Sequence, residues 1–235
     1  MNTGLTELVF ILDRSGSMSG LESDTIGGFN GMIERQKKEG NDINVTTVLF
    51  DDRVDIIHDR FPINQVKPLT DEDYYVRGCT ALLDAVGTSI AKIDNIQSHL
   101  PEENRASKVM FVITTDGMEN SSIEYTYPAI KKLIEARKEK GWEFLFLGAN
   151  IDAAAEAEKI GIARNRSVTY ENDSEGVTRN FEAVGKAMAC YSRCASPNVT
   201  DMSSAISDDW SAEVSEYHEK KKAIRIARNK ARKNA

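Results

Sequence analysis

Three oxygen-bearing side chains stand at alternate positions near the start of the chain, at Asp13, Ser15 and Ser17. They follow an apolar run, residues 8–12, which is typical of a strand buried on both faces in a parallel sheet. Gly16 gives this segment the backbone freedom that a tight loop needs. Because open α/β sheets bind ligands at the carboxyl ends of their strands, we interpret the three residues as candidate metal ligands. Hard oxygen ligands favour Mg²⁺ or Mn²⁺ over zinc.

Two further oxygen-bearing side chains occupy similar positions later in the chain. Asp116 directly follows a second apolar run, residues 109–115, and Thr80 stands just before a helical pattern. Each residue alone has a simple structural explanation, since Ser and Asp are good helix caps. Their joint presence in one chain, at the ends of predicted strands and loops, favours a metal site.

The segment at residues 13–17 resembles the D-x-S-x-S motif of von Willebrand factor type A domains, a family that includes integrin I domains. In that family the motif forms part of a metal-ion-dependent adhesion site, which a threonine and an aspartate complete. Thr80 and Asp116 match those two positions in order and local context. The resemblance covers residues 5–195. It implies an intact site that holds Mg²⁺ (or Mn²⁺) and coordinates a Glu or Asp carboxylate of a partner protein.

Other residues near these positions are weaker candidates. We expect four of them to form a partner-binding rim around the metal: Gly78, Cys79, Gly117 and Asn150. A thiol is a poor Mg²⁺ ligand, so Cys79 is expected beside the metal only as a loop residue. The acidic pair at residues 51–52 and the acidic run at residues 71–73 could hold a second cation. Such clusters are more often solvated loop charge.

Strand-like and helix-like segments alternate along the chain, which predicts a doubly wound α/β sheet. The expected strands are residues 5–12, 43–50, 54–57, 109–115, 142–147 and 167–170. The expected helices are residues 21–39, 81–98, 121–140, 152–160 and 173–194. The second and third strands are so close that they must form an antiparallel hairpin. The predicted fold is a mostly parallel six-stranded sheet with one antiparallel edge strand and helices on both faces, the Rossmann-like fold of the similar family. Gly27 and Gly28 would let the first helix pack closely on the sheet.

The chain divides by composition into a domain at residues 1–195 and a polar linker with a basic C-terminal tail at residues 196–235. Residues 219–235 contain eight Lys or Arg and one Glu, so they carry +7. The whole chain carries −7, so the remainder must carry −14. An acidic body is unsuited to phosphate backbones, and nucleic-acid binding is therefore conceivable only through the tail. The tail is either flexible or docked through Trp210.

Cysteine content and hydropathy bear on the compartment. Three cysteines form no disulfide framework, and a reducing cytoplasm is the simplest interpretation. The apolar run at residues 8–12 is far too short to span a membrane. The resemblance points to an intracellular bacterial or phage type of the family. Such relatives often work beside ATPases or stress-response proteins, so we expect a partner of that kind.

These observations predict a metal-dependent protein-binding module and not an enzyme. The alternatives are a metal-dependent hydrolase at the same site and a nucleic-acid-binding adaptor that acts through the tail. A hydrolase would favour a histidine near Asp13. We expect all three histidines, His58, His99 and His218, on the surface and away from it. A haloacid-dehalogenase-type phosphatase would need an acid where Ser15 stands.

Overall fold

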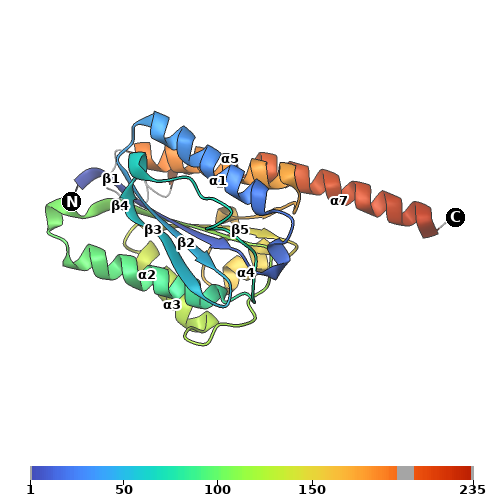
Figure 1. The fold of residues 1–235 in the computed structure, drawn as a ribbon, viewed down its shortest axis with the longest axis horizontal. Helices are drawn as coiled ribbons and strands as arrows, with labels where there is room; N and C mark the ends of the chain where they lie inside the picture. The colour runs from blue at the N-terminus through green and yellow to red at the C-terminus, as the bar shows by residue number, and fades with distance from the viewer. Residues whose placement is uncertain (1, 195–203, 234–235) are drawn as a thin grey trace.

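The sheet is the centre of the molecule in the computed structural model, which describes residues 2–194 and 204–233 (Figure 1). Its six strands lie in the order β3-β2-β1-β4-β5-β6. They are β1 (Asn2–Asp13), β2 (Ile43–Phe50), β3 (Val54–Pro62), β4 (Ala106–Thr115), β5 (Glu143–Ala149) and β6 (Ser167–Tyr170). The edge strand β3 runs antiparallel to β2, and all other neighbours are parallel. The predicted fold class is confirmed.

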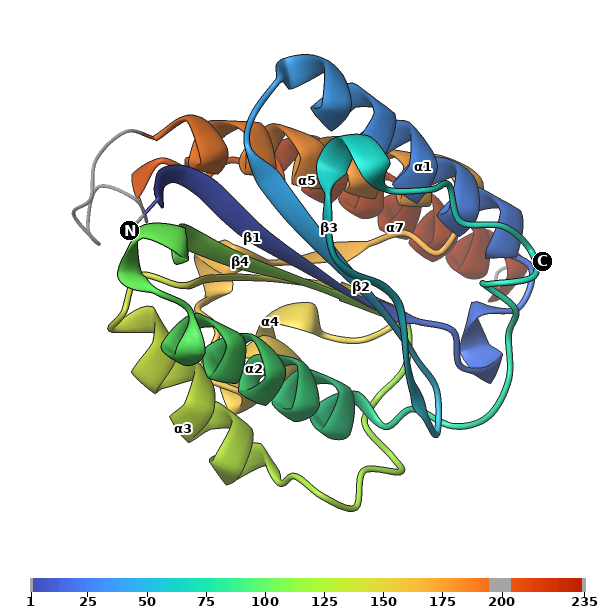
Figure 2. The same ribbon diagram turned by 60° about the vertical axis from the view of Figure 1, so that its left-hand side comes forward.

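Helices cover both faces of the sheet (Figure 2). One face carries α2 (Leu82–His99), α3 (Tyr127–Lys138) and α4 (Ala153–Lys159), and the other carries α1 (Glu22–Glu39), α5 (Ser174–Arg193) and α7 (Ala212–Lys233). Short 3₁₀ turns lie at Gly16–Met18, Ile63–Gln65, Glu102–Asn104 and Arg164–Arg166. Each face has its own buried apolar cluster. None of the described helices combines the length and the apolar character that crossing a membrane requires.

The two central strands explain how distant parts of the sequence meet. Along β1, successive residues such as Phe10 and Ile11 enter the clusters on opposite faces, so the strand is buried on both sides. Leu12 of β1 is aligned with Thr114 of β4 in parallel register. The residues that end these two strands therefore lie next to each other at one edge of the sheet. We call this the carboxyl edge.

The helix predicted at residues 121–140 is shorter in the structure. It begins at Tyr127, with Pro128 in its first turn. Two buried or half-buried carboxylates accept the backbone N–H groups of the preceding residues: Asp84 binds the N–H of Ile123 at 2.8 Å, and Glu119 binds the N–H of Ser122 at 2.7 Å. These side chains give residues 121–126 an alternative to helical hydrogen bonds, which the apolar pattern does not reveal.

The glycines of α1 have a different role from the one predicted. A Cβ atom on Gly28 would lie 2.4 Å from Cδ2 of Phe181, whereas Gly27 has nothing within 4 Å. Gly28 thus permits a close approach of α1 to α5 and not to the sheet. The sequence alone does not show which element covers a helix.

His58 is buried, contrary to the predicted surface position. Only 5% of it is exposed, its ring is stacked with Phe29, and its Nδ1 lies 3.0 Å from the hydroxyl of Thr47. The reason is that β3 extends to Pro62 and turns this position inward against α1. Burial lowers the pKa of His58 below its usual value. His99 is exposed and His218 is half-buried on α7.

The edge hairpin is irregular. Two register shifts interrupt the pairing of β2 with β3. Arg60 adopts a left-handed backbone conformation, with φ of 54°, and its Nε lies 3.0 Å from Oε1 of the buried Glu7. The conformation and the ion pair twist the end of the hairpin away from a regular ladder.

The last part of the chain packs on the domain. Ile206, Trp210 and Val214 belong to the apolar cluster that α1 and α5 form with the sheet, and Nε1 of Trp210 donates to the carbonyl of Asn165 at 2.9 Å. The helix α7 follows directly. The predicted domain boundary at residue 195 lies outside the described residues, and the division of the chain there stays a prediction.

Candidate metal centre

All five predicted ligands lie at the carboxyl edge, on three separate segments. Asp13 ends β1, and the turn after it carries Ser15 and Ser17. Thr80 stands just before α2, and Asp116 directly follows β4. The register of β1 with β4 brings the first and last segments together.

Four of these side chains form one hydrogen-bonded group. The hydroxyl oxygens of Ser15 and Ser17 are 3.1 Å apart, and Thr80 Oγ1 donates to Ser15 Oγ at 3.1 Å. Ser17 Oγ donates to Oδ1 of Asp116. Residues that are up to 99 positions apart in the chain thus contact one another directly.

Asp13 joins this group through its neighbours. Its Oδ1 accepts the backbone N–H of Ser15 at 2.7 Å, and its Oδ2 accepts the hydroxyl of Thr115 at 2.6 Å. The carbonyl of Asp13 accepts the hydroxyl of the buried Tyr74. These contacts fix the orientation of the carboxylate.

Backbone contacts hold the three segments in register. The N–H of Gly16 donates to the carbonyl of Gly78 at 3.2 Å, and the N–H of Arg77 donates to the carbonyl of Arg14 at 3.0 Å. On the other side, Thr80 is bound at both its N–H and its carbonyl by Asn120, at 2.9 and 3.0 Å. The segment that carries Thr80 is therefore held between the other two.

A buried ion-pair network lies behind the site. Arg14 is 2% exposed, and its Nε is 2.8 Å from Oδ2 of the fully buried Asp51. Arg77 binds the same carboxylate oxygen at 2.6 Å. Burial alone would raise the pKa of Asp51, but the hydrogen bonds from the two arginines lower it. Because these arginines occupy Asp51, the suggestion of a second cation at residues 51–52 is not supported.

The acidic run at residues 71–73 also has an internal role. Oδ2 of Asp73 accepts the backbone N–H and the hydroxyl of Thr70, at 2.9 and 2.8 Å. This carboxylate closes a turn. Among residues 2–194 and 204–233, no group of three or more His, Cys, Asp and Glu side chains is arranged to hold a metal. A candidate centre in the described part of the chain therefore has to use hydroxyls, as the five residues do.

The two carboxylates of the centre carry charge in a buried position. Asp13 is 1% exposed and Asp116 is 3% exposed. Burial raises the pKa of Asp13 despite hydrogen bonds from Thr115 and Ser15, and the charge of Asp116 raises it further. Burial likewise raises the pKa of Asp116 against the hydrogen bond from Ser17. A cation would offset the cost of burying both charges.

The donor set suits a hard divalent cation. Two anionic oxygens and three neutral hydroxyls converge, and no softer ligand is among them. Gly117 keeps space free beside two of the hydroxyls, since a Cβ there would lie 3.0 Å from Thr80 Oγ1 and 3.3 Å from Ser17 Oγ. The residues present therefore fit a Mg²⁺ or Mn²⁺ ion.

Sequence reasoning missed Asn172, which follows β6. Its Nδ2 donates to Oδ2 of Asp116 at 3.4 Å, while its Oδ1 is buried without a hydrogen-bond partner in the described part of the chain. The position right after a predicted strand, which led to Asp13 and Asp116, was the available signal. Thr115, the partner of Asp13, was missed because it lies inside the apolar run.

The predicted rim residues lie in different surroundings. Gly78 contacts the turn after β1, and Cys79 is an exposed free thiol next to Thr80. Asn150 directly follows β5 in a left-handed conformation, with φ of 56°, and makes no hydrogen bond to the five ligands. Rim assignments for these residues and Gly117 remain predictions. The same face exposes three large apolar side chains that were not predicted there: Tyr75, Met118 and Ile123.

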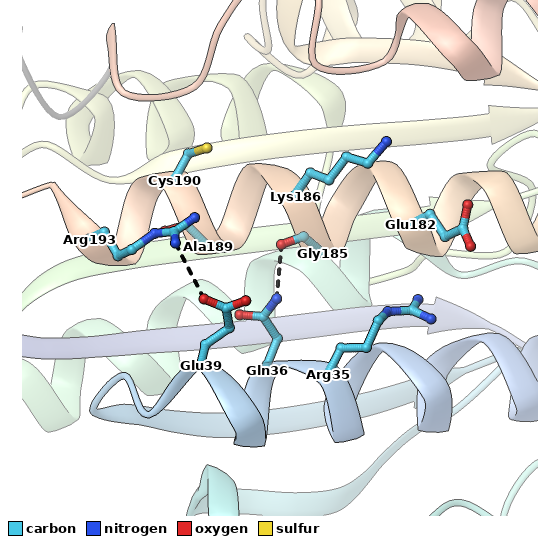
Figure 3. A pocket seen from close by; sticks show the side chains of 9 residues that line it. All are labelled: Arg35, Gln36, Glu39, Glu182, Gly185, Lys186, Ala189, Cys190 and Arg193. Atoms are coloured by element: carbon cyan, nitrogen blue, oxygen red, sulfur yellow. Dashed lines mark hydrogen bonds and ion pairs between the residues drawn. The ribbon is translucent and has the colours of Figure 1, made fainter.

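A groove of about 620 Å³ lies elsewhere, between α1 and α5 (Figure 3). Its lining includes Gln36 and Gly185, which are hydrogen-bonded at 2.9 Å, and Arg193 and Glu39, which form an ion pair at 3.3 Å. None of the five candidate ligands lines it. Its lining on α1 begins at Arg35, about 20 Å along the helix from the end nearest the candidate centre.

No protein-family model and no curated protein sequence matches the chain. Solved structures with a similar fold do exist. The D319A mutant of the PilB minor pilin from Streptococcus sanguinis superposes with a TM-score of 0.56 at 14% identity, over 78% of this chain and 61% of that one. Proximal thread matrix protein 1 from the mussel byssus, described as having a zinc-occupied MIDAS motif, gives 0.53 at 16% identity, over 79% and 46%.

A von Willebrand factor type A structure from Catenulispora acidiphila gives a TM-score of 0.51 at 12% identity, over 79% of this chain and 42% of that one. The chain thus spans about half the length of these structures, between 42% and 61%. At such low identity the likeness concerns the fold. Together with the sheet order and the single antiparallel edge strand, it shows that this chain has a von Willebrand factor type A-like fold.

Proposed function

We propose that the protein is a metal-dependent protein-binding module. The metal is Mg²⁺ (or Mn²⁺), and its role is to coordinate a Glu or Asp side chain of a partner protein. One observation carries the proposal: five oxygen-bearing side chains from three segments converge at the carboxyl edge, two of them buried carboxylates. The ligands would be Asp13, Ser15, Ser17, Thr80 and Asp116.

The charges of these residues favour an anionic partner group. A divalent cation held there would supply a positive charge that attracts an outside carboxylate. Ser15, Ser17 and Thr80 are neutral, so Asp13 and Asp116 at most balance that charge. The hydrogen bonds around Asp13 keep its carboxylate oriented without any contribution from the partner.

The surroundings of the centre support binding over catalysis. Met118 is 59% exposed and Ile123 is 92% exposed, and both lie in the segment that follows Asp116. Apolar side chains exposed around a polar centre suit a face that a partner protein covers. None of the three histidines contacts the five ligands: His58 binds Thr47, His99 binds Asn95 and His218 pairs with Glu171. A hydrolase at this site would therefore lack a histidine as general base.

Further parts of the proposal concern the identity of the metal, the cellular compartment and the kind of partner. Zinc is the ion described for the mussel protein. We favour Mg²⁺ here because every candidate ligand is a hard oxygen. The three cysteines, Cys79, Cys190 and Cys194, form no disulfide, which fits a reducing cytoplasm. We retain a bacterial or phage setting and a partner from an ATPase or stress-response assembly as parts of the proposal.

Thermal melting with and without metal tests the centre. If the dissociation constant is about 1 mM, Mg²⁺ at about 10 mM should stabilise the protein by about 1.4 kcal/mol. For a chain of this size, the melting temperature should rise by about 3–6 °C. The shift should disappear in Asp116→Asn, which keeps the shape of the side chain and removes its charge.

Glu103→Gln is the matched control, since it makes the same chemical change at an exposed position near the opposite edge of the sheet. It should keep the full shift. A wild-type protein that melts at the same temperature with Mg²⁺, Mn²⁺ and chelator would contradict the proposed metal centre.

A further inference from the structure

The helix α7 runs along β6 toward the carboxyl edge. Just before its first residue, Trp210 contacts Asn165, which precedes β6. Further along the helix, the hydroxyl of Tyr217 and Nζ of Lys221 bind Asp173, which follows β6, at 3.1 and 2.9 Å. The direction of α7 is therefore set by contacts at both ends of the strand.

The helix continues past its last contact with the domain. Arg225 pairs with Glu171. Residues 226–233 continue the helix, and the side chains of residues 226–232 are all exposed, with no hydrogen bond or ion pair to the domain among the described residues. At 1.5 Å per residue, this part is about 12 Å long. Figure 1 shows it projecting at the end of the molecule where β1 ends. We call residues 226–233 the overhang.

The loop that holds α7 also reaches the candidate metal centre. Glu171 and Asp173 bind α7, and Asn172 between them donates to Asp116. The overhang thus leaves the domain next to the centre. A partner segment that reaches the metal would pass beside it.

The overhang is basic and unpaired. Arg228, Lys230 and Arg232 are exposed, and no carboxylate in the described part of the chain binds them. Arg228 and Arg232 lie seven and eleven residues after Lys221, so they share its helix face. Near the domain, Lys221 on this face pairs with a carboxylate. On the overhang, the same face carries two arginines that pair with no carboxylate in the described part of the chain.

An isolated basic helix of this kind is unfavourable on its own. Short helices without tertiary support are marginal in water, and like charges four residues apart destabilise them. A row of nearby anions would offset that repulsion. Residues 1–218 carry −14, so the positive electrostatic potential that attracts the anionic groups of another molecule is confined to the basic C-terminal segment that includes the overhang.

We propose that the overhang binds acidic side chains of the same partner whose carboxylate the metal centre takes. The partner is then a protein segment with several Asp or Glu residues around the coordinating one. The inference rests on the proposed function, and it adds the charge of the partner's surroundings. Complementary charge at the rim of an interface gives both specificity and a faster approach.

A peptide selection tests this inference. Random peptides of about 16 residues, which span about 50 Å when extended, are displayed on phage and bound to the immobilised full chain in Mg²⁺. Chelator then releases them for sequencing. The test protein carries Arg228→Gln, Lys230→Gln and Arg232→Gln, and the control carries Lys131→Gln, Lys132→Gln and Lys138→Gln on the exposed face of α3.

The wild type and the α3 control should select peptides with several acidic residues. The overhang variant should select peptides that keep a single acidic residue and lose the others. An acidic peptide from the wild-type selection should bind the overhang variant about tenfold more weakly, because three rim charges are removed. Gln is a good helix former, and circular dichroism should show unchanged helix content.

The remaining outcomes separate the two proposals. Equal acidic content from all three proteins would overturn the role of the overhang and leave the proposed function standing. If chelator releases no peptide from the wild type, the proposed function fails, and the inference fails with it. A random DNA duplex that binds the wild type in chelator, but not the overhang variant, would assign the overhang to nucleic acid and overturn an acidic protein partner.

Discussion

The candidate metal centre and α7 are held to the molecule in opposite ways. At the centre, buried charges and hydrogen bonds connect segments far apart in the sequence, as between Arg14 and Asp51. At α7, Trp210 just before the helix and Val214 on it are buried, and the ion pairs of Lys221 and Arg225 are at the surface. Within the described residues, the overhang pairs with no group of the domain. The comparison shows one tightly connected and one largely unsupported element at the same edge of the sheet. A tightly held site suits a metal ion, whose ligands must keep a fixed geometry. A loosely held basic helix suits a partner segment whose acidic residues vary in position.

The largest effect is expected from Arg14→Ala, which tests the buried ion-pair network behind the candidate metal centre. The substitution removes the buried one of the two arginines that bind Asp51, which should lower the free energy of unfolding by about 3–5 kcal/mol. Urea denaturation measures the loss. Lys92→Ala removes a surface partner of Asp59 and should cost at most about 1 kcal/mol. Similar losses for both variants would contradict a special role for the buried network.

Trp210→Ala tests how α7 is held. It removes a mostly buried ring and its hydrogen bond to Asn165, so the free energy of unfolding should fall by about 2–3 kcal/mol. Hydrogen exchange should accelerate in α7 first, because Val214 is then its main buried contact and its ion pairs are at the surface. The Mg²⁺-induced rise in melting temperature should be retained. Uniform acceleration of exchange throughout the sheet would show that α7 and the domain unfold as one unit.

Two adjacent glycines of α1 test how closely this helix packs against α5. Gly28→Ala places a methyl group 2.4 Å from the ring of Phe181 and should destabilise the protein by about 1–2 kcal/mol. Gly27→Ala meets nothing within 4 Å and should stabilise it by up to about 1 kcal/mol, because Ala favours helix over Gly. Denaturation midpoints of the two variants should therefore move in opposite directions. Equal changes would place the close α1–α5 contact elsewhere.

The smallest expected effect is a pH dependence of α7 docking. Burial would raise the pKa of Asp173, but hydrogen bonds from Lys221, the N–H of Gly176 and Tyr217 lower it. A lowered pKa in the folded state means that docking is strongest above the usual pKa of 3.8. Docking should weaken as pH falls through the lowered value. The fluorescence of Trp210 reports it, and Asp173→Asn should flatten the acid limb of the curve.

Much of the fold followed from the sequence because strands and helices alternate clearly. The apolar runs before Asp13 and Asp116 marked two neighbouring buried strands, and the short connection after Phe50 required the antiparallel hairpin. The five candidate ligands were all named from strand ends and from the resemblance. Their mutual contacts depend on the register of β1 with β4, which a single sequence does not contain.

The misses have a common physical cause. Asn172 reaches Asp116 across 56 positions in the sequence, and Gly28 contacts Phe181 across a helix interface. The burial of His58 depends on how far β3 continues and on which helix covers it. Local sequence patterns show the hydrophobic period of a helix or strand and the residues at which it ends. They do not report which element is its neighbour.

The irregular edge hairpin has a consequence for solubility. An exposed edge strand offers unpaired backbone groups to other chains and can start aggregation. Here the register shifts in the β2–β3 pair, the left-handed Arg60 and the final Pro62 interrupt the straight ladder that another strand would need. Asp55 and Asp59 add charge along the same strand. The twist at β3 therefore protects this edge of the sheet from strand addition by other copies.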